Sequence, residues 1–383
     1  MALLVITLIF GFASFGSKNW IEIGPIGFQP SEIIKVFFIL YLASAFAKKP
    51  KLKELIVPTV LSGIVVLILV GGQNDLGSAL IFYMTFLVLL FIATSNYLYL
   101  IVGLGFISVA SSIAYKLFSH IRVRVEAWQN PWLDVHNKGY QIAQSLFAIC
   151  TWGITGIGFT RGYATSIPVV ERDFIFAAIC EEFGVIFAVG LILIFMFILL
   201  EGARGAIENN NRFLSLVCAG FTALIAFQSF LIIGGVIKFI PLTGVTLPFV
   251  SYGGTSIVIS YIIIAFMQWI IMHNVGYIED KSAEDIHKRV RQPQTRKEAR
   301  ALKKGRTART ERTAKTVRTN KDSLVPVKKT VERPARKRTV KLDENLARPE
   351  SYNRKRRDRS CEVQLKKYFG FMLLFFFCLL DIC

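Results

Sequence analysis

Four short groups of polar residues interrupt an otherwise apolar sequence, and they contain the side chains that could do chemistry. The candidates in these groups are Gln29, Glu32, Lys35, Asp75, Asp173, Glu181, Glu182, Ser251 and Ser256. Ionisable groups inside a membrane segment cost free energy unless they are paired, so they usually mark a functional site. The sequence therefore predicts that these residues form a site within or at the edge of a membrane.

The carboxylates differ in the depth at which they are expected. Asp173 stands at the outer edge of a predicted membrane helix, where it can act as a general base or, alternatively, cap the helix. Glu181 and Glu182 fall about two turns deeper, so they must face the protein interior, a cavity or a cation. Glu32 and Lys35 are spaced to neutralise each other, either within the site or as a structural ion pair.

Two further features concern the ends of helices. Asp75 precedes a predicted helix, where an aspartate is a common N-cap. Residues 241–256 contain two prolines, three glycines and several hydroxyl side chains. Membranes tolerate irregular backbone only where protein or a water-filled cavity satisfies it. We therefore expect a broken or re-entrant segment before the last helix.

The elements that must position these residues are membrane helices. A span needs about 20 apolar residues, and suitable runs lie at 1–15, 30–47, 55–72, 76–94, 97–118, 174–200, 212–236 and 251–273. The chain is 53% hydrophobic with a mean hydropathy of +0.50. These values predict an all-α polytopic protein with about eight spans. The first run starts at Met1 without a preceding basic region, which favours a spanning helix over a cleavable signal peptide.

Charge predicts the orientation and the domains. Residues 281–367 hold 30 Lys and Arg against 11 Asp and Glu, which accounts for the whole net charge of +19. The positive-inside rule places this tail, the loop with Lys48 and the loop with Arg204 in the cytoplasm, and the connection 119–173 outside. The domains are a membrane domain over 1–273, a disordered basic tail over 274–367 and a short hydrophobic segment over 368–383 without an assigned role.

The same composition limits the partners and ligands. The positive charge belongs to the tail and not to a folded surface, so we expect no nucleic-acid partner. The tail is expected to bind anionic lipid or an acidic cytosolic partner, or simply to remain solvated. Six scattered cysteines, without a CxxC pair or a histidine cluster, predict neither a disulfide nor a zinc site.

In their order, these motifs resemble the SEDS family, which comprises FtsW, RodA and SpoVE. The resemblance covers about residues 1–273. It departs from the family pattern at Cys150-Thr151-Trp152-Gly153 and at Glu171-Arg172. The matching residues are Trp20-Ile21, Gly24, Gln29-Pro30-Ser31-Glu32, Lys35, Gln73, Asp75-Leu76-Gly77, Arg124, Pro131, Gly139-Tyr140-Gln141, Gln144-Ser145, Gly156, Gly158, Pro168, Asp173-Phe174-Ile175-Phe176, Glu181-Glu182, Gly184 and the run 241–256.

This resemblance implies a ten-helix bundle, of which the chain supplies the last eight helices. It also implies an inverting peptidoglycan glycosyltransferase of the bacterial plasma membrane, which polymerises lipid II during elongation, division or sporulation beside a class B penicillin-binding protein. The reaction needs a base, for which we expect Asp173, and cations for the leaving diphosphate. The loop offers Arg124, Lys138 and Arg161 for that role, with Gln141 as a supporting residue. No cofactor is expected, although a divalent cation could assist.

Two other classes of function remain open. A transporter or lipid flippase would also use intramembrane charges and broken helices, but it would place them near mid-membrane and show an inverted repeat. Here the richest motifs gather on the outer side, and we find no repeat. A non-catalytic scaffold for cell-wall assembly is the second alternative.

Overall fold

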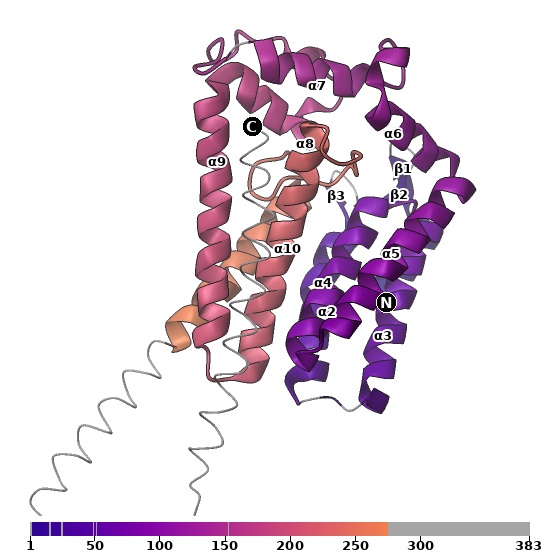
Figure 1. Ribbon diagram of the computed structural model, residues 1–383, viewed down its shortest axis with the longest axis vertical. Helices are drawn as coiled ribbons and strands as arrows, with labels where there is room; N and C mark the ends of the chain where they lie inside the picture. Colours follow the sequence, from indigo (N-terminus) through magenta and orange to yellow (C-terminus); the bar gives the residue numbers. More distant parts are fainter. Residues whose placement is uncertain are drawn as a thin grey trace, which may run out of the picture. The chain divides into compact units, whose positions relative to one another are not determined.

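The computed structural model is built mainly of helices and describes residues 2–274 except 15–16, 24–25, 49, 51 and 152. Seven described helices are long and apolar enough to cross a membrane. They are α2 (Pro30–Ala47), α3 (Leu52–Leu67) with its continuation η1 (Ile68–Gly72), α4 (Leu76–Thr94), α5 (Tyr97–Leu117), α9 (Ile175–Glu208), α10 (Arg212–Val236) and the helix Gly254–Asn274 (Figure 1). The predicted helical polytopic fold is confirmed. The predictions for 275–383 lie outside the described residues.

The first predicted span differs from the structure. The helix α1 (Ala2–Phe10) has nine residues instead of the expected fifteen, and three short antiparallel strands follow it. These are β1 (Phe12–Ser14), β2 (Ser17–Ile23) and β3 (Ile26–Phe28). The reason lies in the polar run Ser17 to Asn19, which interrupts the apolar stretch, and in the apolar–polar alternation of Ile21, Glu22 and Ile23, which favours a strand over a helix.

Short elements carry the chain across one end of the bundle. They are α6 (Ser119–Gln129), η2 (Pro131–Asp134), α7 (Tyr140–Thr151), η3 (Ala164–Ser166) and α8 (Val170–Asp173). The helix predicted over 142–149 is thus present as α7. In Figure 1, α6 and α7 lie over one end of the long helices. The predicted long connection 119–173 is therefore a structured layer.

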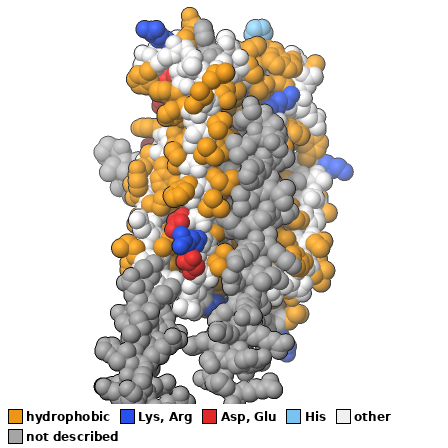
Figure 2. All heavy atoms as spheres, turned by 60° about the vertical axis from the view of Figure 1, so that its left-hand side comes forward, with side chains coloured by type: hydrophobic (Ala, Val, Ile, Leu, Met, Phe, Trp, Pro, Cys, Tyr) orange, Lys and Arg blue, Asp and Glu red, His pale blue; other side chains and the backbone are white. Residues whose placement is uncertain are grey.

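Helix α10 forms the centre of the bundle. In its apolar membrane-spanning stretch 94% of the residues are buried, whereas in that of α5 only 6% are. It packs against α9, α4 and α2, and a Cβ on Gly220 would lie 2.6 Å from Ile39, which shows how closely α2 approaches. A helix that is apolar on all sides belongs in the interior. Hydrophobic side chains cover most of the described surface seen in Figure 2, as expected for a protein surrounded by lipid.

The connections sort to the two ends of the bundle in the predicted way. The α2–α3 and α9–α10 connections and the end of helix Gly254–Asn274 lie at the end opposite α7 and α8 (Figure 1). Two hydrogen bonds tie this end together: Arg212 donates to the Ala93 carbonyl at 2.8 Å, and Asn274 donates to the Glu208 carbonyl at 2.9 Å. The predicted cytoplasmic loops therefore share one end.

Helix α9 is interrupted near its start. Gly184 has φ +81° and ψ 176°, which only glycine adopts readily, and a Cβ there would lie 2.2 Å from the Ile154 carbonyl oxygen. The backbone N–H groups of Ile157 and Gly158 donate to the carbonyls of Glu181 and Glu182 at 2.9 and 3.0 Å. The loop after α7 thus docks onto the opened turn. Beyond it the helix continues to Glu208, past the predicted end at residue 200.

Candidate active site

Asp173 is the last residue of α8, which lies near the same end of the bundle as α7 (Figure 1). The segment after α10 holds this short helix: Ser251 donates to the Arg172 carbonyl at 2.6 Å, and the Tyr252 N–H donates to the Glu171 carbonyl at 2.8 Å. A Cβ on Gly244 would lie 3.7 Å from Asp173 Oδ2 and 3.6 Å from both terminal nitrogens of Arg124. Gly244, with φ +73°, therefore leaves open the space that the acid and the guanidinium share.

The structure overturns the alternative that Asp173 caps the following helix. Helix α9 begins at Ile175 after Phe174, and no side chain caps it. Among the described residues, Asp173 forms no ion pair within 4.0 Å. Its carboxylate is half-buried.

The surroundings of Asp173 raise its basicity. Burial raises the pKa of this carboxyl from 3.8 to about 6, while the nearby charges of Arg124 and Arg172 lower it and that of Asp75 raises it. At neutral pH the group is then mostly ionised, yet close to the pKa at which a general base is most effective.

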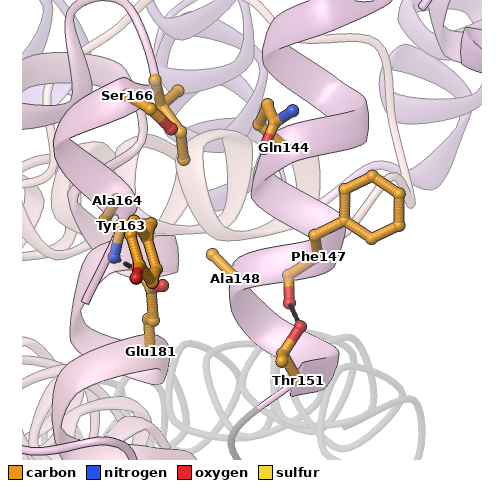
Figure 3. Close-up of a pocket in the computed structure, with 9 residues that line it drawn as sticks. Gln144, Phe147, Ala148, Thr151, Tyr163, Ala164, Ser166 and Glu181 are labelled. Atoms are coloured by element: carbon orange, nitrogen blue, oxygen red, sulfur yellow. Dashed lines mark hydrogen bonds between the residues drawn. The ribbon is translucent and has the colours of Figure 1, made fainter.

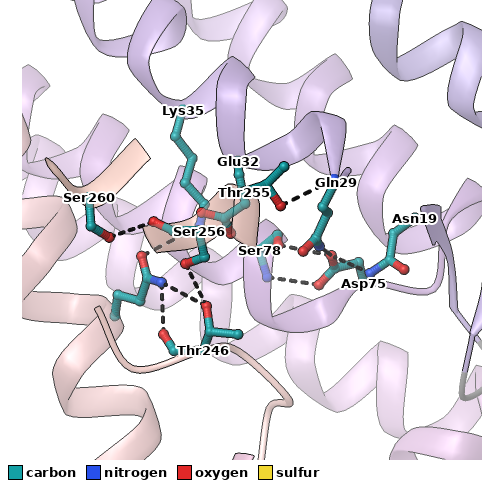
Figure 4. A network of polar contacts seen from close by, with 11 residues as sticks. Asn19, Gln29, Glu32, Lys35, Asp75, Ser78, Thr246, Thr255, Ser256 and Ser260 are labelled. Atoms are coloured by element: carbon teal, nitrogen blue, oxygen red, sulfur yellow. Dashed lines mark hydrogen bonds and ion pairs between the residues drawn. The ribbon is translucent and has the colours of Figure 1, made fainter. Parts of the chain in front are cut away.

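Asp75 is confirmed as an N-cap, and it does more than cap. Its Oδ1 accepts the Ser78 N–H at 3.0 Å, as in an ordinary cap. Its Oδ2 accepts from Asn19 at 3.1 Å, Gln29 at 3.2 Å and the Ser78 hydroxyl at 2.8 Å. Figure 4 shows these donors converging from β2, α4 and the start of α2. Asp75 therefore joins three elements beside the site.

Glu32 and Lys35 form the predicted ion pair, with 2.6 Å between Nζ and Oε1, and both are buried. Lys35 also donates to Gln228 at 3.5 Å, and Gln228 donates to the Thr246 carbonyl at 2.8 Å. The hydroxyls of Thr246 and Ser256 are 2.7 Å apart (Figure 4). This chain of contacts links α2 through α10 to the broken segment 241–256, which carries Gly244.

The predicted loop cations are only partly brought to Asp173. Arg124 lies beside it and donates to the Leu242 carbonyl at 3.4 Å. Lys138 instead forms an exposed ion pair with Glu126 at 3.6 Å, and Arg161 is exposed in the loop that docks onto α9. The second cation near Asp173 is Arg172, whose guanidinium lies 5.4 Å from the ring centre of Trp20.

The remaining predicted residues lie to one side of this cluster. Gln141 donates to the Pro168 carbonyl at 3.2 Å and thereby ties α7 to the chain leading into α8. Glu181 faces the protein interior, which is one of its predicted environments, and its Oε1 accepts the Tyr163 N–H at 2.8 Å. Glu182 is half-buried, and its backbone carbonyl accepts the Gly158 N–H at 3.0 Å. Arg172, Gln228 and Thr246 were not predicted, because nothing in their spacing indicates that they meet the site.

The family model for the cell cycle proteins FtsW, RodA and SpoVE matches residues 1–275. The chain belongs to this family. The peptidoglycan glycosyltransferase RodA of Mycobacterium tuberculosis H37Rv is 32% identical over 66% of the chain, and the match spans 57% of that relative's length. Stage V sporulation protein E of Bacillus subtilis is 35% identical over 67% of the chain and 72% of its own length.

Solved structures agree with this assignment to the FtsW/RodA/SpoVE family. A chain of a peptidoglycan synthase complex that coordinates polymerization and crosslinking matches with a TM-score of 0.59 and 27% identity, over 71% of this chain and 78% of that one. A mutant form of the rod shape-determining protein RodA of Thermus thermophilus matches with a TM-score of 0.51 and 25% identity, over 71% and 74%.

The residues of this family member that the structure describes contain no group of three or more His, Cys, Asp and Glu side chains able to hold a metal ion. Both oxygens of Asp75 already accept hydrogen bonds.

Proposed function

We propose that the chain is a peptidoglycan glycosyltransferase that polymerises lipid II at the outer face of the bacterial plasma membrane. The observation that carries the proposal is Asp173: a half-buried carboxylate with a pKa of about 6 that lies beside Arg124 at the outer end of a membrane bundle. The curated relatives named peptidoglycan glycosyltransferases support the same activity.

The geometry fits one chemical step. Asp173 takes the proton from the acceptor sugar hydroxyl while that oxygen attacks the anomeric carbon of the donor. The bond between this carbon and the diphosphate oxygen breaks, and the electron pair leaves with the lipid diphosphate. Arg124 and Arg172 supply the positive charge that stabilises the departing group. Attack from the face opposite the leaving group inverts the anomeric centre.

A crosslinking partner follows from the same assignment. The structural neighbour belongs to a complex that both polymerises and crosslinks peptidoglycan, and we propose a class B penicillin-binding protein as the corresponding transpeptidase here. The basic tail lies outside the described residues, so its binding to anionic lipid or an acidic cytosolic partner stays a prediction.

The test is polymerisation of lipid II by the purified full chain, free of other glycosyltransferases. We expect Asp173→Asn to lower the rate by about 10²- to 10⁴-fold, because asparagine keeps the shape but accepts no proton. The matched control is Asp134→Asn in the outer layer, for which we expect wild-type activity.

Two negative results are possible in this assay, and they bear on different parts of the proposal. Substantial polymer from Asp173→Asn would remove Asp173 from the role of base. A wild-type chain that makes no polymer, alone or with its transpeptidase, would refute the proposed enzymatic activity and favour the role of a non-catalytic scaffold.

A further inference from the structure

A separate cavity of about 290 Å³ lies beneath α7, on the side of α9 where that helix is interrupted. Helix α7 contributes Gln144, Ala148 and Thr151 to one wall, and the segment around η3 contributes Tyr163 and Ser166 to the other. Glu181 of α9 closes it (Figure 3). Such a volume is near the lower end for small-molecule pockets, about 300–1,000 Å³, so it has room for one ring.

Glu181 gives this cavity its chemistry. The residue is only 3% exposed, and its Oε1 accepts the Tyr163 N–H at 2.8 Å. Its Oε2 is buried and has no hydrogen-bond partner. A buried acceptor without a donor costs free energy, and a ligand that brings a hydroxyl or N–H group recovers it.

The fold holds this carboxylate in place before any ligand arrives. The Glu181 carbonyl accepts the Ile157 N–H at 2.9 Å, because the loop after α7 enters the opened turn at Gly184. A Cβ on Gly162 would lie 2.9 Å from Glu181 Oε2, so the opposing backbone approaches closely. Rigid placement of a polar group is typical of a site built for recognition.

The cavity is also close to the proposed catalytic residue along the chain. Ile167 lines it, and the Ile167 carbonyl accepts the N–H of Val170, the first residue of α8. Asp173 is the last residue of the same short helix. One turn of helix therefore separates the cavity wall from the carboxylate that would act on a substrate.

The lining selects one class of ligand. An acidic wall disfavours a diphosphate, whereas a carboxylate, an amide and hydroxyls together match the hydroxyl and N-acetyl groups of an amino sugar. The ring of Tyr163 lies beside Glu181 (Figure 3) and offers an apolar face to a sugar ring. We propose that this cavity is a subsite for one N-acetylated sugar unit of the glycan, a proposal that rests on the function proposed above.

Binding measurements on the full chain in nanodiscs test the subsite, and they do not depend on turnover. The probes are fluorescent lipid II, its analogue without the stem peptide, and undecaprenyl diphosphate, which has no sugar. We expect Glu181→Gln and Gln144→Leu each to weaken binding of both sugar-bearing probes by about tenfold or more, and to leave undecaprenyl diphosphate binding unchanged. Glu201→Gln, the same substitution near the other end of α9, should bind all three probes as wild type does.

Several outcomes would overturn the subsite. Equal affinity of the two cavity variants and wild type for lipid II refutes it, even if the chain polymerises lipid II normally. A loss confined to the peptide-bearing probe shows that the cavity takes an ammonium group of the peptide and not a sugar. Wild type that binds lipid II no better than undecaprenyl diphosphate refutes it too, and the polymerisation assay then decides separately whether the proposed activity stands.

Discussion

The carboxylate of Asp173 is balanced between opposing influences. Burial and the charge of Asp75 raise its pKa, and the guanidinium groups of Arg124 and Arg172 lower it. These residues come from three different elements, α8, α6 and the start of α4, so the basicity of the site is a product of the fold. A change in any one of them should therefore appear in the pH dependence of the reaction.

The expected pH profile follows from the sign of these shifts. A general base works only when ionised, so the rate of polymerisation at low substrate concentration should rise with pH through about 6 and then level off. Arg124→Gln removes a positive charge that lowers the pKa of Asp173, so the rising limb should move to higher pH. Initial rates measured between pH 4.5 and 8.5 check this.

A distant arginine provides the control for that experiment. Arg204→Gln removes an equal charge, but this residue pairs with Glu208 near the other end of α9, so its profile should match that of wild type. If the limb stays in place in Arg124→Gln while the rate falls, Arg124 acts on the leaving group and not on the basicity of Asp173.

At the scale of elements, the interruption of α9 joins two parts of the outer layer. The loop that follows α7 bonds to the backbone of α9 on both sides of the break, since Val185 N–H donates to the Gly153 carbonyl at 3.3 Å. These hydrogen bonds hold Glu181 in position at the wall of the cavity beside α7. The joint depends on the positive φ of Gly184, which other residues rarely adopt.

Gly184→Ala should therefore destabilise the outer layer. The new methyl group would be strained at φ +81° and would meet the backbone of Ile154, which costs on the order of 1–3 kcal/mol. Thermal unfolding of the purified chain measures this as a lower melting temperature. Gly190→Ala in the same helix has open space around its Cβ and should leave stability unchanged or raise it slightly. Equal melting temperatures of the two variants would contradict this role of Gly184.

The helices that sequence predicts best are those whose ends carry their own signals. Pro30 begins α2 and Asp75 caps α4, so the predicted starts of these helices coincide with the observed ones. The break at Gly184 has no such signal, because one glycine in an apolar run is compatible with an ordinary helix. Strand β1 has three residues, which merged with the preceding apolar run in the prediction, and β2 and β3 fall in what was predicted as a connection.

The residues of the candidate site also fall into two groups, those that residue type predicts and those that only the fold brings together. Asp173 and Arg124 were predicted from residue type and from their place at the outer face. The placing of Lys138 and Arg161 depends on the path of the loop, which composition does not determine. Arg172 and Gln228 belong to the site only because β2, α8 and the segment 241–256 are brought together in space.

Across the whole molecule, the polar contacts of the site join residues from Asn19 to Ser260 (Figure 4). The site is therefore assembled by β2, α2, α4, α10 and the segment 241–256 together, and not by one loop. The opposite end gathers the α2–α3 and α9–α10 connections (Figure 1). If the membrane orientation is as predicted, these two ends of the bundle face different sides of the membrane.

Labelling of single cysteines in whole cells tests this orientation. In a chain whose six native cysteines are replaced by serine, we expect His136→Cys in the outer layer to react with a membrane-impermeant maleimide in intact cells. Asn210→Cys, in the α9–α10 connection, should react only after lysis, because the basic residues near that end favour the cytoplasm. Both positions are exposed, so a lack of reaction reflects the compartment and not burial. The reverse pattern would place Asp173 in the cytoplasm, where it could not add sugars to a cell wall outside the membrane.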